Sequence, residues 1–352
     1  MDNLVLVTGA SGFVGLHCVK LLLANGFNVR GTVRSLRNAR KIEPLNNLKR
    51  ETTTRGTLQL CEADLMNESS WEKAVNGCTS VLHVAAPVPL PSAVEDELKL
   101  IELSVEGTMN VLRAAARENT VRRVVITSSI SAVCAGVRKK NEFDEKDYSR
   151  TESRYASSYD RSKTLAEKAA WQFVKQINQA EGRQLELVTI CPGLILGPNM
   201  HGGDFASSEA VARIMRGGAP LVPRLYMPIV DVRDVARAML RALEQPNAAG
   251  ERILLVNQPS TSFVDIARIL HAEFRSKGYL ISTIPCPFVF VKVGSWFSPT
   301  LRYALPFIDR PISFDTRKMK NLLEMNDLIP PSQSIVEMAY NLIEHGQLPK
   351  KY

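Results

Sequence analysis

The stretch Leu4-Val5-Leu6-Val7-Thr8-Gly9-Ala10-Ser11-Gly12-Phe13-Val14-Gly15 opens the chain and decides its fold. An apolar run of strand length leads into three glycines at three-residue spacing, and the helical pattern of residues 16–23 follows. In such a unit one glycine permits the turn, the next lets the backbone approach a pyrophosphate, and the third lets the helix pack on the sheet. The helix N–H groups then face the anion. A plain turn is the alternative, because the commoner fingerprint is Gly-x-Gly-x-x-Gly.

Length and charge narrow the class of protein. With 352 residues the chain can form a large core and two lobes. The 44 Lys and Arg residues outnumber the 36 Asp and Glu residues, which gives a net charge of +8, and the densest basic cluster lies in residues 34–41. No basic arm or nucleic-acid-binding motif accompanies this charge. We therefore expect a small anionic ligand and no nucleic acid.

The spacing of the cysteines and the length of the apolar runs indicate in which cellular compartment the protein is expected. The six cysteines are scattered without a Cys-x-x-Cys pair, which predicts reduced thiols in the cytoplasm, no disulfide and no metal site. The amino terminus enters a strand at once, so we expect no secretory signal. The apolar stretch Ile284–Phe297 contains two prolines and Lys292 and is shorter than the roughly 20 residues that span a bilayer. It is predicted to be core or a helix of the substrate lobe, with membrane contact as the alternative.

The second predicted strand, Asn28–Val33, is followed by Arg34. An acidic residue near this point would bind the ribose 2′-hydroxyl of NAD, whereas an arginine accommodates a 2′-phosphate. The guanidinium can grip a phosphate with two hydrogen bonds, and Lys41 can add a point charge. The sequence therefore favours NADP(H), with a solvated basic helix face as the alternative.

Three further apolar runs predict strands, at residues 58–61, 80–84 and 123–127. Loops at the carboxyl ends of parallel strands line the ligand crevice of an open α/β sheet. Asp64 is therefore placed to meet the adenine amino group, although it could instead cap a helix over residues 67–75. The small residues Ala85 and Ala86 let a dinucleotide lie against the backbone. Residues 44–56 are predicted to be a surface loop, and residues 95–118 a long helix.

The candidate catalytic residues are Ser129, Tyr159 and Lys163. Ser129 follows the strand at residues 123–127, and a helix is predicted to begin near Ser158. Tyr159 and Lys163 then share one helix face, where the ammonium and an oxidised nicotinamide would favour the phenolate and lower the usual tyrosine pKa of about 10. Ser129 would hydrogen-bond the substrate oxygen, and Tyr159 would protonate it as hydride arrives. A surface Tyr and Lys without chemistry are the alternative, but the order of glycine turn, Ser and Tyr-x-x-x-Lys favours catalysis.

With these motifs the chain resembles the extended, two-lobed branch of the short-chain dehydrogenase/reductase superfamily over nearly its whole length. The resemblance also includes the stretch Cys191-Pro192-Gly193-Leu194-Ile195-Leu196-Gly197-Pro198. The pattern is most similar to the dihydroflavonol reductase-like and the ketone or aldehyde reductase-like members, and next to the 3β-hydroxysteroid dehydrogenases. The resemblance implies that residues 192–198 cover the nicotinamide and that Arg34 and Lys41 bind the 2′-phosphate. The full predicted cofactor set is Thr8, Gly9, Ser11, Gly12, Phe13, Val14, Gly15, Arg34, Lys41, Asp64, Leu65, Val84, Ala85, Ala86, Thr127, Ser128, Tyr159, Lys163, Pro192, Gly193 and Ile195.

The chain departs from the patterns of the families that it resembles at three points. Cys134 stands where plant dihydroflavonol reductases carry an Asn that selects flavonoid hydroxyls. The Lys-Asn-Trp-Tyr-Cys-Tyr pattern of cinnamoyl-CoA reductases is absent around residues 155–159. Ser104 replaces the Asn that assists proton relay in shorter superfamily members. Neither plant substrate is therefore assigned, and no relay is assigned to Ser104.

We expect an α/β protein with a doubly wound, parallel Rossmann sheet and a smaller carboxyl-terminal substrate lobe. The NADP-binding domain is predicted to comprise residues 1–192 and about 226–258, and the substrate lobe residues 193–225 and about 259–352. Asp231 is predicted to cap a helix. The expected activity is hydride transfer between NADPH and a ketone or aldehyde of a small, apolar substrate, in a cytoplasmic monomer or homodimer without a membrane span. The alternatives are 3β-hydroxysteroid oxidation, nucleotide-sugar epimerisation, or an inactive NADP(H) sensor.

Overall fold

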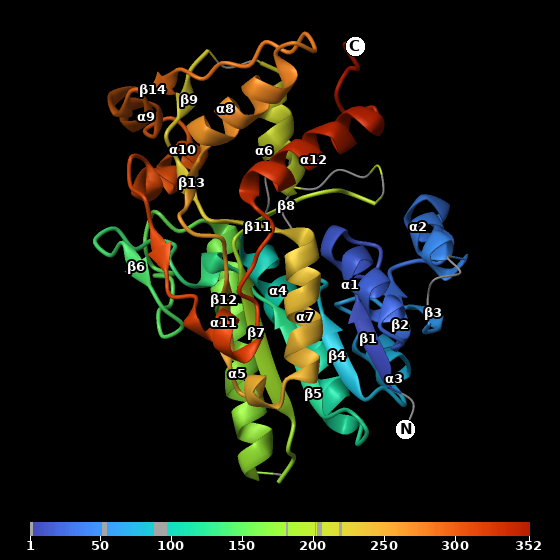
Figure 1. The fold of residues 1–352 in the computed structure, drawn as a ribbon. Helices are drawn as coiled ribbons and strands as arrows, with labels where there is room; N and C mark the ends of the chain where they lie inside the picture. Colours follow the sequence, from blue (N-terminus) through green and yellow to red (C-terminus); the bar gives the residue numbers. More distant parts are fainter. Residues whose placement is uncertain are drawn as a thin grey trace.

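A seven-stranded parallel sheet forms the centre of the molecule (Figure 1). The computed structural model describes residues 3–50, 55–87, 97–180, 182–200, 202, 206–217 and 220–352. The strand order is β12-β7-β5-β4-β1-β2-β3, so the winding reverses between β1 and β4 and the predicted fold class is confirmed. The strands are β1 (Leu4–Thr8), β2 (Asn28–Val33), β3 (Leu58–Glu62), β4 (Ser80–His83), β5 (Arg123–Thr127), β7 (Glu186–Pro192) and β12 (Arg252–Leu255).

Helices cover both faces of this sheet because its strands carry apolar side chains on both faces. Val5 and Val7 pack in one core cluster with α1 (Phe13–Ala24), α2 (Ala39–Arg50) and α7 (Val232–Glu244). Leu6 points to the opposite face and joins a second cluster. That cluster contains side chains of α3 (Glu68–Val75), α4 (Glu97–Arg117) and α5 (Ser158–Ala180).

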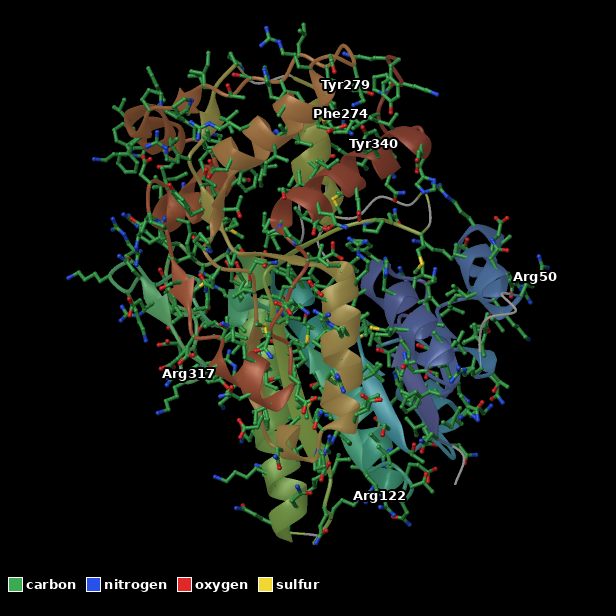
Figure 2. The ribbon with its side chains drawn as sticks, viewed as in Figure 1. Arg50, Arg122, Phe274, Tyr279, Arg317 and Tyr340 are labelled. Atoms are coloured by element: carbon green, nitrogen blue, oxygen red, sulfur yellow. The ribbon has the colours of Figure 1, made fainter. Side chains whose placement is uncertain are left out.

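The remaining elements form a second lobe (Figure 1) around a core cluster that also contains Phe13 of α1 and Val232 of α7. Phe274, Tyr279 and Tyr340 lie together there (Figure 2), with ring centroids of Phe274 and Tyr340 4.8 Å apart. The strands outside the main sheet are β6 (Glu142–Phe143), β8 (Leu194–Leu196), β9 (Val222–Pro223), β10 (Tyr226–Met227), β11 (Ile229–Asp231), β13 (Thr261–Ser262), β14 (Pro285–Cys286) and β15 (Ser313–Phe314). The remaining helices are α6 (Ala206–Met215), α8 (Phe263–Phe274), α9 (Phe288–Gly294), α10 (Pro299–Ala304), α11 (Arg317–Leu322) and α12 (Pro331–Glu344), with 3-10 turns η1 (Ile130–Ala132), η2 (Pro246–Ala248) and η3 (Leu305–Phe307).

Strand β11 leads the chain from this lobe into α7, which packs on the main sheet. It pairs in parallel with β8 and ends at Asp231, whose carboxylate accepts a hydrogen bond from the Arg233 N–H at 2.8 Å. Asp231 is therefore the cap of α7, as predicted.

The structure corrects two sequence predictions about local structure, one of them only in part. Residues 44–50 belong to α2, with Pro44 inside the helix, although a loop was predicted. Ile42, Leu45 and Leu48 are buried, and their packing offsets a proline cost of about 3 kcal/mol. The second concerns residues 284–297, which were predicted to be core or a helix of the substrate lobe. The helix is present as α9, but the segment is not core, because most of its large apolar side chains are exposed. Residues 51–54 and 88–96 lie outside the described part of the chain.

Within the described ranges, no helix is both long and apolar enough to cross a bilayer. The same residues contain no group of three or more His, Cys, Asp or Glu side chains that could hold a metal ion. All six cysteines are free thiols.

Candidate active site

The glycine turn between β1 and α1 has the geometry that its sequence predicts. Gly9 has a φ of +65°, and its N–H donates to the Thr32 hydroxyl at 3.2 Å. A Cβ on Gly15 would lie 2.2 Å from the Gly9 carbonyl oxygen, so a larger residue would push the helix away from the turn. A Cβ on Gly9 would lie 3.1 Å from Ala85 on the neighbouring loop. The turn therefore depends on glycine for close backbone packing.

Thr8 joins the ends of β1 and β4, on either side of the point where the winding reverses. Its hydroxyl accepts hydrogen bonds from the N–H groups of Val84 and Ala85, both at 3.0 Å. The same oxygen lies 2.9 Å from Nδ1 of the buried His83. Ligands of doubly wound sheets bind in the crevice at such a point. Thr8 therefore fixes one wall of that crevice.

The residues around the turn fit a dinucleotide. Gly12 is the N-cap of α1 in an extended conformation, with no side-chain cap and no acidic residue in the first turn. The amino end of α1, which includes Phe13 and Val14, can therefore offer backbone N–H groups and a positive dipole end to a pyrophosphate. Arg34 is exposed directly after β2, and Lys41 lies in the first turn of α2.

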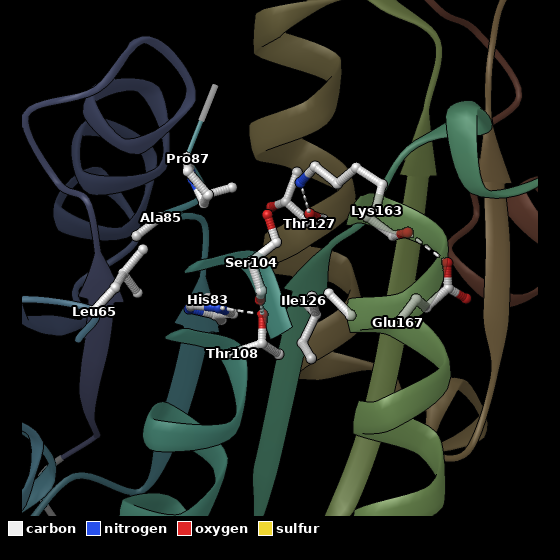
Figure 3. Close-up of a pocket in the computed structure, with 13 residues that line it drawn as sticks. Leu65, His83, Ala85, Pro87, Ser104, Thr108, Ile126, Thr127, Lys163 and Glu167 are labelled. Atoms are coloured by element: carbon white, nitrogen blue, oxygen red, sulfur yellow. Dashed lines mark hydrogen bonds between the residues drawn. The ribbon is translucent and has the colours of Figure 1, made fainter. Parts of the chain in front are cut away.

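Several predicted residues meet in one pocket at the carboxyl ends of β4 and β5 (Figure 3). They are Leu65, Ala85, Ala86, Thr127, Ser128 and Lys163. Arg34, Lys41 and Asp64 lie outside this pocket, after β2 and β3. Asp64 does not cap α3, whose N-cap is Asn67, and its carboxylate instead accepts from the Met66 N–H at 2.9 Å. The adenine role of Asp64 stays a prediction.

Ser129, Tyr159 and Lys163 are brought together. Tyr159 lies in the first turn of α5, and its phenol is hydrogen-bonded with the Ser129 hydroxyl. The Ser129 oxygen also accepts from the Ser131 N–H at 3.1 Å, which fixes the serine at the start of η1. Lys163 lies one turn further along α5, and its ammonium donates to the Thr127 carbonyl at 3.2 Å. The three side chains thus converge where β5 and α5 meet.

The protein alone does not lower the pKa of Tyr159 as the sequence predicted. Burial raises this pKa to about 12, with the negative charge of Asp160 adding to the rise and the bond with Ser129 opposing it. Burial is the largest contribution to this rise, and the Lys163 ammonium donates to the Thr127 carbonyl rather than to the phenol. Burial also lowers the pKa of Lys163 to about 8, and the negative charge of Glu167 opposes that change.

Sequence reasoning missed Glu167 and Arg252. The Glu167 carboxylate accepts from the Ser128 hydroxyl at 2.5 Å and from Arg252 Nε at 2.6 Å, and both charged residues are buried. The Tyr148 ring lies 4.0 Å from the Arg252 guanidinium carbon. The available signal was the spacing, because Glu167 is four residues after Lys163 and shares its helix face.

His83 was also missed, although it lines the pocket. Burial lowers its pKa to about 3, and the charge of Lys163 lowers it further. The ring is therefore neutral at ordinary pH. Its second nitrogen lies 3.4 Å from the Thr108 hydroxyl, which in turn donates to the Ser104 carbonyl at 2.8 Å.

The segment that begins at Pro192 lies outside the pocket lining. The Gly193 N–H donates to the Leu255 carbonyl at 3.1 Å, and a Cβ there would lie 2.3 Å from the Pro228 carbonyl oxygen. Ile195 pairs with Val230 of β11. These contacts hold residues 192–195 between β12 and β11. Their contact with the nicotinamide stays a prediction.

Cys134 lies in the protein core and does not line the pocket. It is 3% exposed, and its thiol donates to the Ile130 carbonyl at 3.4 Å. Burial raises the pKa of this thiol. Cys134 therefore supplies no polar group to a substrate.

The fold and the clustered Ser, Tyr and Lys define an oxidoreductase with a Rossmann cofactor domain. The model of the NAD dependent epimerase/dehydratase family matches residues 5–256. The chain belongs to this family, within the extended short-chain dehydrogenase/reductase superfamily, as predicted.

Its relatives are reductases. The chain is 33% identical to cinnamoyl-CoA reductase 1 of Petunia hybrida, over 99% of this chain and 94% of that one. It is 34% identical to tetraketide alpha-pyrone reductase 1 of Arabidopsis thaliana, over 98% and 96% of the two chains. The structure of yeast methylglyoxal/isovaleraldehyde reductase Gre2, complexed with NADPH, matches with a TM-score of 0.78 and 26% identity, over 98% and 99% of the chains. The predicted enzyme class is confirmed.

Proposed function

We propose that this protein is an NADPH-dependent reductase of a ketone or aldehyde in a small, apolar substrate. The observation that carries the proposal is the convergence of Ser129, Tyr159 and Lys163, of which Lys163 lines the pocket. Arg34 after β2 supports NADP(H), because a cofactor without the 2′-phosphate would favour an acidic residue there. The similarity to reductases, including Gre2 complexed with NADPH, agrees with both parts of the proposal.

The protonation states suit reduction. Bound NADPH supplies the hydride that the side chains cannot supply. With a pKa raised to about 12, the Tyr159 phenol carries its proton at neutral pH and can donate it to the carbonyl oxygen. The Ser129 hydroxyl can hold that oxygen close to the phenol. Lys163, with a pKa of about 8, keeps its charge near neutral pH, and its ammonium would stabilise the remaining phenolate once it turns from the Thr127 carbonyl toward Tyr159.

The two plant substrates are not carried over to this chain. The residue that would select flavonoid hydroxyls is replaced by the buried Cys134. We further propose a cytoplasmic location, which the six free cysteines support, and a monomer or homodimer. Size-exclusion chromatography with light scattering tests the oligomeric state.

The enzyme assay follows NADPH consumption over a panel of aldehydes, ketones and ketosteroids. We expect turnover with NADPH, and Tyr159→Phe should lose nearly all of it while still binding NADPH by fluorescence. Tyr155→Phe is the matched control, because the Tyr155 phenol is bonded to Arg154 at 2.8 Å and lacks a lysine four residues later. Full activity of Tyr159→Phe would remove the proposed acid.

The same preparation separates the alternatives. Oxidation of 3β-hydroxysteroids with NAD as the preferred cofactor would favour the dehydrogenase. Interconversion of nucleotide sugars without net cofactor use would favour an epimerase. NADPH binding without turnover of any compound in the panel would favour a sensor.

A further inference from the structure

Helix α9 and the turn after it present large apolar side chains to solvent. The exposed fraction is 61% for Phe290, 69% for Trp296 and 83% for Phe297. Val291 is the buried residue of α9, although surface helices usually turn their apolar side toward the core. We call this surface the α9 face, defined by Ile284, Phe288, Val289, Phe290, Val293, Trp296 and Phe297.

The charges of the chain segment that carries most of the α9 face have one sign. Residues 275–308 contain Arg275, Lys277, Lys292 and Arg302, and neither Asp nor Glu. Lys277 forms an ion pair with Glu273, which lies just before this segment, and Lys277 Nζ is 2.7 Å from Glu273 Oε1. In the part of the chain that the structure describes, the other three cations have no ion-pair partner. Lys292 is exposed within α9 itself, and Arg302 lies on α10.

The backbone beneath these side chains is already hydrogen-bonded. The Phe290 N–H donates to the Pro287 carbonyl at 3.0 Å, and the Trp296 N–H donates to the Val293 carbonyl at 3.1 Å. The Ser295 hydroxyl donates to the Lys292 carbonyl at 2.7 Å. Removing water from this face therefore leaves these peptide groups satisfied, which is the condition for contact with lipid.

We propose that the α9 face docks on a membrane surface that contains anionic phospholipid. Aromatic and aliphatic side chains combined with lysine or arginine are typical of segments that lie in the interface between headgroups and acyl chains. Lys292 and Arg302 would meet the lipid phosphates. A second copy of the same face is disfavoured, because a symmetric contact would place the unpaired cations of both copies against each other.

Vesicle flotation of the full-length protein tests the proposal. We expect binding to vesicles of phosphatidylcholine and phosphatidylserine, weaker binding to phosphatidylcholine alone, and loss of binding at high salt. Lys292→Gln should weaken binding about fivefold, because one cation near an anionic surface contributes about that factor. Phe290→Ser combined with Phe297→Ser should reduce binding further.

Tryptophan fluorescence locates the contact. Trp71 is 1% exposed and Trp171 is partly buried, whereas Trp296 is 69% exposed, so a blue shift on vesicle binding reports the α9 face. Trp296→Phe should still float with the vesicles but lose the shift. A shift that persists in Trp296→Phe would place the contact elsewhere and overturn the proposal.

Matched variants control for charge and exposed apolar area. Arg122→Gln removes one exposed charge at the end of the molecule far from α9 (Figures 1 and 2), and Leu98→Ser removes an apolar side chain that is 77% exposed. Both should bind vesicles like the wild type, and all variants should unfold at similar temperatures. Wild type that binds neither kind of vesicle would overturn the proposal. The proposal would also be overturned if the wild type were a dimer and Phe290→Ser dissociated it, because a second copy of the chain would then cover the α9 face.

Discussion

Glu167 and Arg252 form a buried ion pair beneath the catalytic residues. Their side chains are 1% and 6% exposed, and the Glu167 carboxylate oxygen lies 2.6 Å from Arg252 Nε. Arg252 also donates to the carbonyls of Glu145 at 3.0 Å and Ala132 at 3.2 Å. Through Ser128 this pair contacts the strand end that precedes Ser129. The ion pair therefore helps to hold the backbone at Ser128, next to the catalytic Ser129, in place.

Removing the charge of Glu167 should destabilise the protein. Glu167→Gln leaves the Arg252 charge buried without its partner, and we expect a loss of about 3–5 kcal/mol in the free energy of unfolding. Urea titration measures this loss. The control is Glu209→Gln, whose partner Arg216 lies 3.0 Å away on the surface, and this change should cost about 1 kcal/mol or less. Equal losses for the two variants would contradict the prediction.

The activity should depend on the protonation of Lys163. Because its pKa is about 8, the ammonium loses its proton as the pH rises through this value, and kcat for reduction should fall. The negative charge of Glu167 raises this pKa, so Glu167→Gln should move the fall to lower pH. A pH profile of kcat under saturating NADPH checks both statements. An unmoved profile in the variant would contradict the coupling.

Cofactor choice should depend on Arg34. Arg34→Ser removes the predicted partner of the 2′-phosphate, and hydrogen bonds to charged groups are worth enough to weaken NADPH binding by about tenfold to a hundredfold. NADH binding should change little. Arg50→Ser, at the far end of α2 (Figure 2), is the control and should leave both affinities unchanged. Tighter binding of NADH than NADPH by the wild type would refute the role of Arg34.

The third glycine of the turn should not tolerate a methyl group. Gly15→Ala would place its Cβ 2.2 Å from the Gly9 carbonyl oxygen, so α1 must shift away from the turn. We expect a loss of stability of about 1–3 kcal/mol and weaker NADPH binding. In Gly346→Ala nothing lies within 4 Å of the new Cβ, although φ is +70°. That control should lose some stability to backbone strain but bind NADPH normally.

His83 should make the protein sensitive to acid. Its pKa is lowered to about 3 in the folded state, against 6.5 as the ordinary value. The stability that this neutral ring contributes is present above pH 6.5 and lost as the pH falls toward 3, because only the unfolded chain takes up the proton in that window. The slope for one proton is about 1.4 kcal/mol per pH unit. Urea titrations at several pH values should therefore give a shallower dependence for His83→Gln.

The part of the site that sequence could predict is local in the chain. The glycine turn and the Tyr159 and Lys163 pair follow from short spacings, and Ser129 follows from its place after a strand. Arg252 could not be predicted, because its partner Glu167 lies on a distant helix and the two meet only through the order of the strands. The direction of the Tyr159 pKa shift follows from the burial of the phenol, which the spacing of Tyr159 and Lys163 does not reveal.

The errors in the fold have related causes. Pro44 indicated a loop, but the burial of Ile42, Leu45 and Leu48 outweighed it. The apolar composition of residues 284–297 did not reveal that most of these side chains face solvent rather than the core. The domain boundaries and the cofactor contacts of residues 192–195 stay predictions.

The chain returns to the main sheet late in the sequence, and this limits how the enzyme can be truncated or recombined by engineering. The chain leaves the sheet after β7 and rejoins it at β12, which carries Arg252. A fragment that ends at Pro192 would keep the glycine turn, Tyr159 and Lys163 but lack the cation that neutralises Glu167. Residues 1–192 are therefore not expected to function as an independent domain. A graft that exchanges the intervening lobe must be joined at both ends, so that β12 still docks beside β7.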